Sequence, residues 1–157
     1  MKSYKIQLIR ALFIALLSFS TFGMAEPVSQ SASDAARIEM LERALAPNSA
    51  KAVVEMFAKA NKERNGAVQF MLFSDELKKK FKDNWPSWVS GVSSPWITSY
   101  AIKNLTNNKF QITYQWATSQ GPFKPFLVQT IKIEPVPKSQ AGSQKFWISQ
   151  FEESSAN

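Results

Sequence analysis

The sequence predicts an α+β domain, with helices first and a four-stranded antiparallel meander after them. Three observations lead to this class. Apolar residues recur at helical spacing in the first half of the chain, they alternate with period 2 from residue 96 onward, and short turns join the alternating segments. Short connections join antiparallel neighbours, and segregated helices and strands favour α+β over α/β. We expect the amphipathic helices to pack on one face of the sheet.

The helical half follows a small, polar segment at residues 26–33, which is typical of a flexible lead. A first helix is predicted over residues 34–45, because apolar side chains recur on one face and Pro47 follows as a stop. That apolar face consists of Ile38, Leu41 and Leu45.

A second helix is predicted to begin at a cap, either Asn48 or Ser49, and to be closed by Asn65-Gly66. Its predicted core-facing residues are Val53, Val54, Phe57, Ala58 and Asn61.

One broken helical segment is predicted after this helix, made of an apolar piece at residues 67–73 and a lysine-rich turn that starts at Ser74-Asp75. Residues 84–95 combine two prolines, a glycine and several serines, which indicates a loop.

The four predicted strands cover residues 96–103, 110–116, 126–134 and 146–151. Asn107-Asn108 is predicted as a turn, because asparagine tolerates left-handed backbone conformations. Residues 34–152 are therefore expected to form a single domain, with 153–157 as a polar tail.

The 157-residue chain contains neither histidine nor cysteine. These absences exclude an imidazole base, a Ser-His-Asp triad, a thiolate nucleophile, disulfides, and metal sites built on His or Cys. We expect no cofactor and no metal. Hydrophobic residues make up 45% and charged residues 20% of the chain, as in globular domains.

Residues 1–25 have the pattern of a secretory signal peptide. Three basic residues precede an uncharged apolar run at residues 11–25, which ends with the small residues Gly23 and Ala25. The run is shorter than the ~20 residues that span a bilayer, and an uncleaved anchor is the alternative. We predict cleavage after Ala25 and export to the periplasm or the exterior, with no stable membrane anchor afterwards. Cleavage would remove 3 of the 19 basic residues and none of the 12 acidic ones, so the net charge would fall from +7 to +4.

Residues 50–151 resemble an NTF2-like domain of the small, secreted bacterial kind. The most recognisable pieces are Asn65-Gly66-Ala67-Val68-Gln69 and Gly91-Val92-Ser93-Ser94-Pro95-Trp96. The resemblance implies a curved sheet wrapped around a helix, which forms a cone with a cavity. It implies little about activity, because one fold hosts many functions.

Aromatic side chains are the candidates for contact with a ligand or partner: Trp85, Trp88, Trp96, Tyr100, Tyr114 and Phe126. The alternative is that these side chains fill the core. The two tryptophans in the predicted loop, Trp85 and Trp88, are the better candidates for partner contact.

A cluster of lysines offers a second candidate surface, which would bind an anionic polymer or lipid head groups. It consists of Lys78, Lys79, Lys80 and Lys82. The alternative is a solvated helix face. The export signal and the lack of a nucleic-acid-binding motif argue against nucleic acid.

The predicted function is an exported, non-catalytic binding module whose partner is a protein or a small apolar ligand, with a second copy of the chain as a further candidate partner. One alternative is a small enzyme of the isomerase or dehydratase type, in which a carboxylate and a tyrosine transfer a proton in the cone. The other is an anionic-surface binder. No catalytic residue is assigned, because the predicted strands hold a single carboxylate, Glu134.

Overall fold

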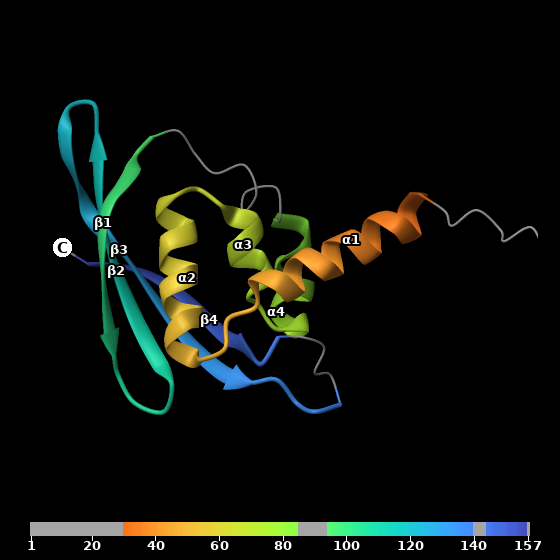
Figure 1. Cartoon of the computed structure of the whole chain (residues 1–157). Coiled ribbons are helices and arrows are strands. Elements are labelled where there is room, and N and C mark those ends of the chain that lie inside the picture. Colours follow the sequence, from red (N-terminus) through yellow and green to blue (C-terminus); the bar gives the residue numbers. More distant parts are fainter. Residues whose placement is uncertain (1–29, 85–93, 140–143, 157) are drawn as a thin grey trace, which may run out of the picture. The chain divides into compact units, whose positions relative to one another are not determined.

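The computed structural model describes residues 30–84, 94–139 and 144–156 (Figure 1). The chain divides after Ala35, and residues 36–157 form one compact unit. Of the preceding unit, the structure describes only residues 30–35, which belong to the start of a helix. The predicted signal peptide and the predicted loop residues 85–93 lie outside the described residues.

The described residues contain four α-helices and a four-stranded sheet, so the predicted α+β class is confirmed. The helices are α1 (Gln30–Leu45), α2 (Ala50–Lys62), α3 (Gly66–Met71) and α4 (Asp75–Phe81), followed by a 3-10 turn, η1 (Lys82–Asn84). The strands are β1 (Trp96–Asn104), β2 (Lys109–Thr118), β3 (Gly121–Pro135) and β4 (Phe146–Ala156).

The sheet is an antiparallel meander with the order β1-β2-β3-β4. Asn107 and Asn108 connect β1 to β2 with φ angles of +52° and +56°, which confirms the predicted turn. The register places Tyr100 of β1 opposite Tyr114 of β2, which in turn pairs with Leu127 of β3. Side chains that pair across strands share a face, so this row marks the side of the sheet toward the helices.

Helix α2 lies against that face of the sheet and forms the centre of the core (Figure 1). Ser49 begins the helix, because its hydroxyl accepts a hydrogen bond from the amide of Ala52 at 3.1 Å. Four of the predicted core positions are fully buried: Val53, Val54, Phe57 and Ala58. They pack against buried isoleucines of the sheet, Ile112, Ile131, Ile133 and Ile148.

The segment from α3 to α4 attaches to β4 through Phe73. The backbone amide of Ile148 donates to the carbonyl of Leu72 at 2.8 Å. The backbone amide of Ser74 donates to the carbonyl of Ile148 at 2.9 Å. The Phe73 ring lies 5.6–5.8 Å from the rings of Phe57, Phe81 and Phe151. This cluster fixes α4 to the end of the sheet.

Helix α1 differs from the prediction that the N-terminal helices cover the sheet. It begins at Gln30, inside the predicted lead, and buries none of its residues. Its apolar face is solvent-exposed, with Ile38 at 56%, Leu41 at 62% and Leu45 at 48%. The spacing correctly predicted a helix, but α2 already covers the helix-facing side of the sheet at its centre.

Two boundaries also differ from the prediction. Asn65-Gly66 does not close α2; the turn lies at Arg64, with a φ angle of +59°, and Asn65 caps α3 by accepting from the Val68 amide at 3.3 Å. The polar tail predicted at residues 153–157 is largely strand, because β4 continues to Ala156. It continues because β3 extends beside it as far as Phe126, which pairs with Ala156.

Candidate functional site

A long hollow lies between α2 and the edge strand β1. Its wider part has a volume of about 740 Å³ and a floor of apolar side chains, notably Met56, Val68 and Ile102, beside the ring of Tyr100. A second part of about 470 Å³ shares Glu55 and Ile102 with the first and extends toward the β1–β2 turn. We call the two parts together the α2–β1 groove. It is lined by Leu45, Ala50, Lys51, Ala52, Val54, Glu55, Met56, Lys59, Ala60, Glu63, Asn65, Val68, Tyr100, Ile102, Asn104, Asn108 and Phe110.

The groove follows from the residues that α2 presents beside its core face. Ala52, Met56 and Ala60 are spaced four residues apart and therefore lie on one side of the helix. The two alanines have short side chains, so the space between α2 and β1 stays unfilled. On β1, Tyr100 and Ile102 point toward the helices, because alternate residues of a strand share a face.

Charged side chains on α2 flank the apolar floor in matched pairs. Lys51 and Glu55 lie 3.7 Å apart, and Lys59 and Glu63 also lie 3.7 Å apart, each at i, i+4 spacing. All four side chains are more than half exposed, so each pair contributes little to stability. The rim is thus nearly neutral above an apolar floor, which suits an apolar protein segment with a mixed-charge border.

The groove runs along an open edge of the sheet. Strand β1 pairs with β2 on one side, and no other strand in the described part of the chain pairs with its second side. The opposite edge differs, because Phe73 forms a parallel bridge with Ile148 of β4. Unpaired backbone groups at a sheet edge accept a partner, so β1 adds hydrogen-bonding capacity to the apolar groove.

A row of polar side chains lies beneath α2 next to the groove. Asn61 of α2 donates to Gln129 of β3 at 3.4 Å, and Gln129 donates to the carboxylate of Glu153 on β4 at 3.0 Å. The rings of Tyr100 and Tyr114 are 6.1 Å apart in the same region. The structure therefore brings two of the predicted contact residues together.

The Tyr114 hydroxyl is fully buried and has no hydrogen-bond partner among the described residues. Burial raises the pKa of Tyr114 above its ordinary value of 10.0, because the phenolate would lose its hydration. The nearby Asn61 amide lowers the pKa of Tyr114, but by less than burial raises it. Tyr114 therefore stays protonated at neutral pH.

Among the described residues of this row, no carboxylate is buried. The buried polar residues in the described part of the chain are Gln69, Ser74 and Gln129, and no carboxylate is among them. Glu153, the carboxylate of the row, is exposed to solvent. The described residues also contain no group of three or more acidic side chains that would hold a metal ion.

The other predicted aromatic contacts are dispersed. Trp96 begins β1 and is 36% exposed. Phe126 precedes Leu127, which pairs with Tyr114, so the alternation of the strand places Phe126 on the opposite face of the sheet from Tyr114. There Phe126 lines a separate hollow of about 290 Å³, with the ammonium of Lys124 5.4 Å from its ring. Trp85 and Trp88 lie outside the described residues.

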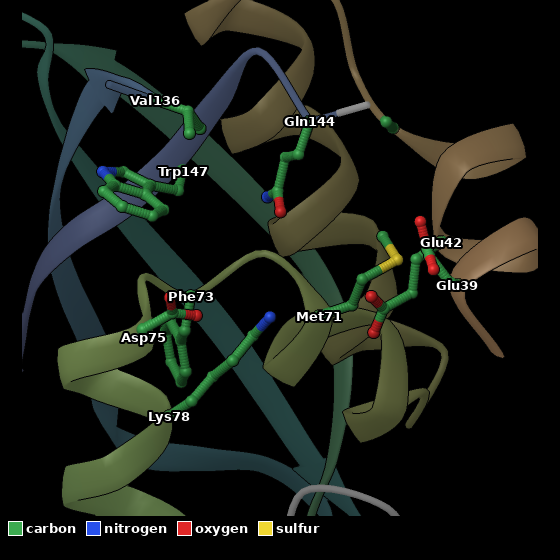
Figure 2. A pocket seen from close by; sticks show the side chains of 10 residues that line it. Glu39, Glu42, Met71, Phe73, Asp75, Lys78, Val136, Gln144 and Trp147 are labelled. Atoms are coloured by element: carbon green, nitrogen blue, oxygen red, sulfur yellow. The ribbon is translucent and has the colours of Figure 1, made fainter. Parts of the chain in front are cut away.

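The predicted lysine cluster does not share one surface. Lys78 is half-buried and lines a small hollow of about 150 Å³, into which Glu39 and Glu42 of α1 also project (Figure 2). Its ammonium therefore faces carboxylates. The other three lysines of the cluster are exposed: Lys79, Lys80 and Lys82. Anionic-surface binding remains a prediction that involves these three residues.

Sequence reasoning missed several groups of the groove and the polar row. Met56 and Ala60 lie next to the core-facing residues of α2, which gave the stronger periodic signal. Their spacing from Ala52 was nevertheless visible in the sequence. Gln129 and Glu153 become neighbours only through strand register, which a sequence without known pairing does not give.

Comparison with known proteins adds no relative. No family model matches the chain, and no curated protein or solved structure matches it. In the part of the chain that the structure describes, no helix combines the length and apolar character needed to cross a membrane. The groove geometry is therefore the basis for a functional proposal.

Proposed function

We propose that this protein is an exported, non-catalytic interaction module that holds an apolar protein segment in the α2–β1 groove. The observation that carries the proposal is the coincidence of an apolar groove with a sheet edge that has no neighbouring strand among the described residues. Either feature alone is common in small domains. Together they provide side-chain pockets and backbone hydrogen bonds along one line, which is how several peptide-binding domains recognise their partners.

The same proposal includes the NTF2-like cone and export. The order of helices before an antiparallel meander, with α2 against one face of the sheet, supports a cone whose open side is the groove. The basic and apolar pattern of residues 1–25 supports export, with cleavage after Ala25. Export places the groove in the envelope or outside the cell, where it would meet other exported proteins.

Site-specific photo-crosslinking tests the proposal in cells that produce the protein. A benzophenone amino acid replaces Tyr100, which lines the groove, or Ala101, which is exposed and points to the other face of the same strand. We expect the groove position to crosslink to a polypeptide and the Ala101 position to crosslink much less. The added substitution Met56→Glu should abolish the crosslink from position 100, because it places a charge on the apolar floor.

Two outcomes would contradict the proposal. Equal crosslinking from positions 100 and 101 would show that the groove is not the contact surface. Crosslinking at position 100 that persists with Met56→Glu would show that the partner bypasses the apolar floor.

A further inference from the structure

The small hollow that Lys78 lines lies between α1, α4 and the β3–β4 connection, and it shares no lining residue with the α2–β1 groove (Figure 2). We call it the α1–α4 hollow. Its volume is about 150 Å³, which corresponds to the liquid volume of about five water molecules. Sites for drug-sized ligands occupy ~300–1,000 Å³, so this hollow suits a much smaller molecule.

Charged side chains of both signs line the α1–α4 hollow without pairing with each other. Lys78 of α4 lines it together with Glu42 of α1 and Asp75 of α4. None of these three side chains makes an ion pair within 4.0 Å in the described part of the chain. The remaining carboxylate, Glu39, pairs with Arg43 at 2.9 Å instead. A molecule that carries both charges can therefore contact each sign without displacing an existing ion pair.

The Gln144 side chain adds a hydrogen-bond donor that lacks an acceptor. Its amide nitrogen is buried and has no hydrogen-bond partner among the described residues. Figure 2 shows this amide and the Lys78 ammonium extending into the same space. Buried polar atoms are hydrogen-bonded in the large majority of cases. Two donors, one of them charged, thus converge on the hollow and indicate an anionic acceptor such as a carboxylate.

The other walls of the α1–α4 hollow are apolar. Met71 and Phe73 are buried, and Val136 and Trp147 are half-buried. Sites for small molecules combine such walls with a few convergent polar groups, which fix the orientation of the ligand. An aliphatic group that enters the hollow would remove apolar surface from water.

We propose that the α1–α4 hollow binds a small free α-amino acid in its zwitterionic form. The Lys78 ammonium and the Gln144 amide hold the carboxylate of the ligand, while the carboxylates of Glu42 and Asp75 hold its ammonium. A branched aliphatic side chain of the ligand packs against Trp147. This site is separate from the groove and does not depend on the docking of a protein segment there.

The mixed charge of the hollow favours a zwitterion over a simple ion. An anion that has no ammonium would face Glu42 and Asp75, and an amine that has no carboxylate would face Lys78. Like charges at short range repel, so either ion would bind more weakly than the zwitterion. The terminus of a polypeptide carries only one of the two charges, and the same argument disfavours it.

Isothermal titration calorimetry of the purified exported chain tests the proposal with three probes of similar shape. L-valine carries both charges, 3-methylbutanoate lacks the ammonium, and isobutylamine lacks the carboxylate. We expect saturable binding of L-valine, and weaker binding of each of the other two by about tenfold or more, because each loses one set of charged hydrogen bonds.

A variant of Lys78 separates direct contact from a structural role. Lys78→Met should weaken the binding of L-valine by about tenfold, because the carboxylate loses its charged donor. The same variant should strengthen the binding of isobutylamine, because it removes a like charge. A general loss of structure would weaken both. Lys79→Met is the matched control, since Lys79 is exposed and does not line the hollow, and it should change neither affinity.

Three outcomes would overturn the proposal. One is the absence of saturable binding of L-valine at several millimolar. Another is equal affinity for L-valine and 3-methylbutanoate, which would mean that the carboxylates of the hollow do not contact the ligand. The third is an equal effect of Lys78→Met and Lys79→Met on the affinity for L-valine. The crosslink from position 100 tests the groove separately, and its result does not depend on any of these measurements.

Discussion

Gln129 donates its side-chain amide to the carboxylate of Glu153 at 3.0 Å across the β3–β4 pair, while its own oxygen accepts from Asn61 of α2. Gln129 is 2% exposed, whereas Glu153 is exposed to solvent. The pair therefore connects the interior beneath α2 with the surface of the sheet. Gln129 supplies the side-chain oxygen to which the Asn61 amide donates.

The substitution Gln129→Ala should reduce the free energy of unfolding by about 1–3 kcal/mol, because it leaves the Asn61 amide in a partly buried site without its acceptor. Urea denaturation measures the change. Gln150→Ala is the matched control on β4, where the side chain is exposed, and it should stay within about 0.5 kcal/mol of the native value. Equal effects of the two substitutions would show that the polar row does not contribute to stability.

Tyr114→Phe should leave the free energy of unfolding unchanged or increase it. The Tyr114 hydroxyl is buried without a hydrogen-bond partner among the described residues, so its removal relieves a desolvation cost and retains the ring packing. The same denaturation experiment tests this expectation. A loss of more than about 1 kcal/mol would indicate that the hydroxyl makes a hydrogen bond of ordinary strength.

The native protein should lose stability as the pH rises above 10. Burial raises the pKa of Tyr114 above its ordinary value of 10.0, so the folded state keeps its proton at a pH where the unfolded state has begun to release it. The stability associated with this proton is complete below pH 10 and declines above it. Thermal melts between neutral pH and pH 11 should show a smaller decline for Tyr114→Phe than for the native chain. Parallel declines would exclude Tyr114 as a source of the alkaline sensitivity.

Phe73→Ala should cost about 3–5 kcal/mol, because Phe73 is fully buried at the centre of the aromatic cluster and truncation would leave a cavity. Phe123→Ala removes the same atoms from a ring that is 42% exposed on β3, and it should cost much less. Calorimetry or denaturation of both variants measures the difference. A small effect at Phe73 would mean that the cluster repacks without a cavity.

The elements were predictable where one local signal decided them. The spacing of Val53 and Phe57 predicted a buried helix, and the asparagine pair at Asn107 predicted the turn between β1 and β2. Each signal depends on neighbours within a few residues, so the amino-acid pattern contains the necessary information. The α+β class followed from the order of these elements.

The placement of apolar faces and polar partners was less predictable, because it depends on space that distant residues already occupy. The Ile38 stripe has the same spacing as a core helix but is exposed. Lys78 belongs to a lysine run but faces the carboxylates of α1. Gln129 and Glu153 are 24 residues apart and meet only through strand register. Such contacts require the tertiary arrangement, which composition and periodicity do not define.

The unequal edges of the sheet limit how large an assembly can grow through strand pairing. Phe73 occupies the outer side of β4 at Ile148, whereas β1 has no second neighbour in the described residues. A chain that pairs through a single edge can add one neighbour and then has no further edge to offer. Association through β1 alone would therefore end at a closed pair. The bridge at Phe73 thus occupies the position at Ile148 where another strand would pair on the opposite edge.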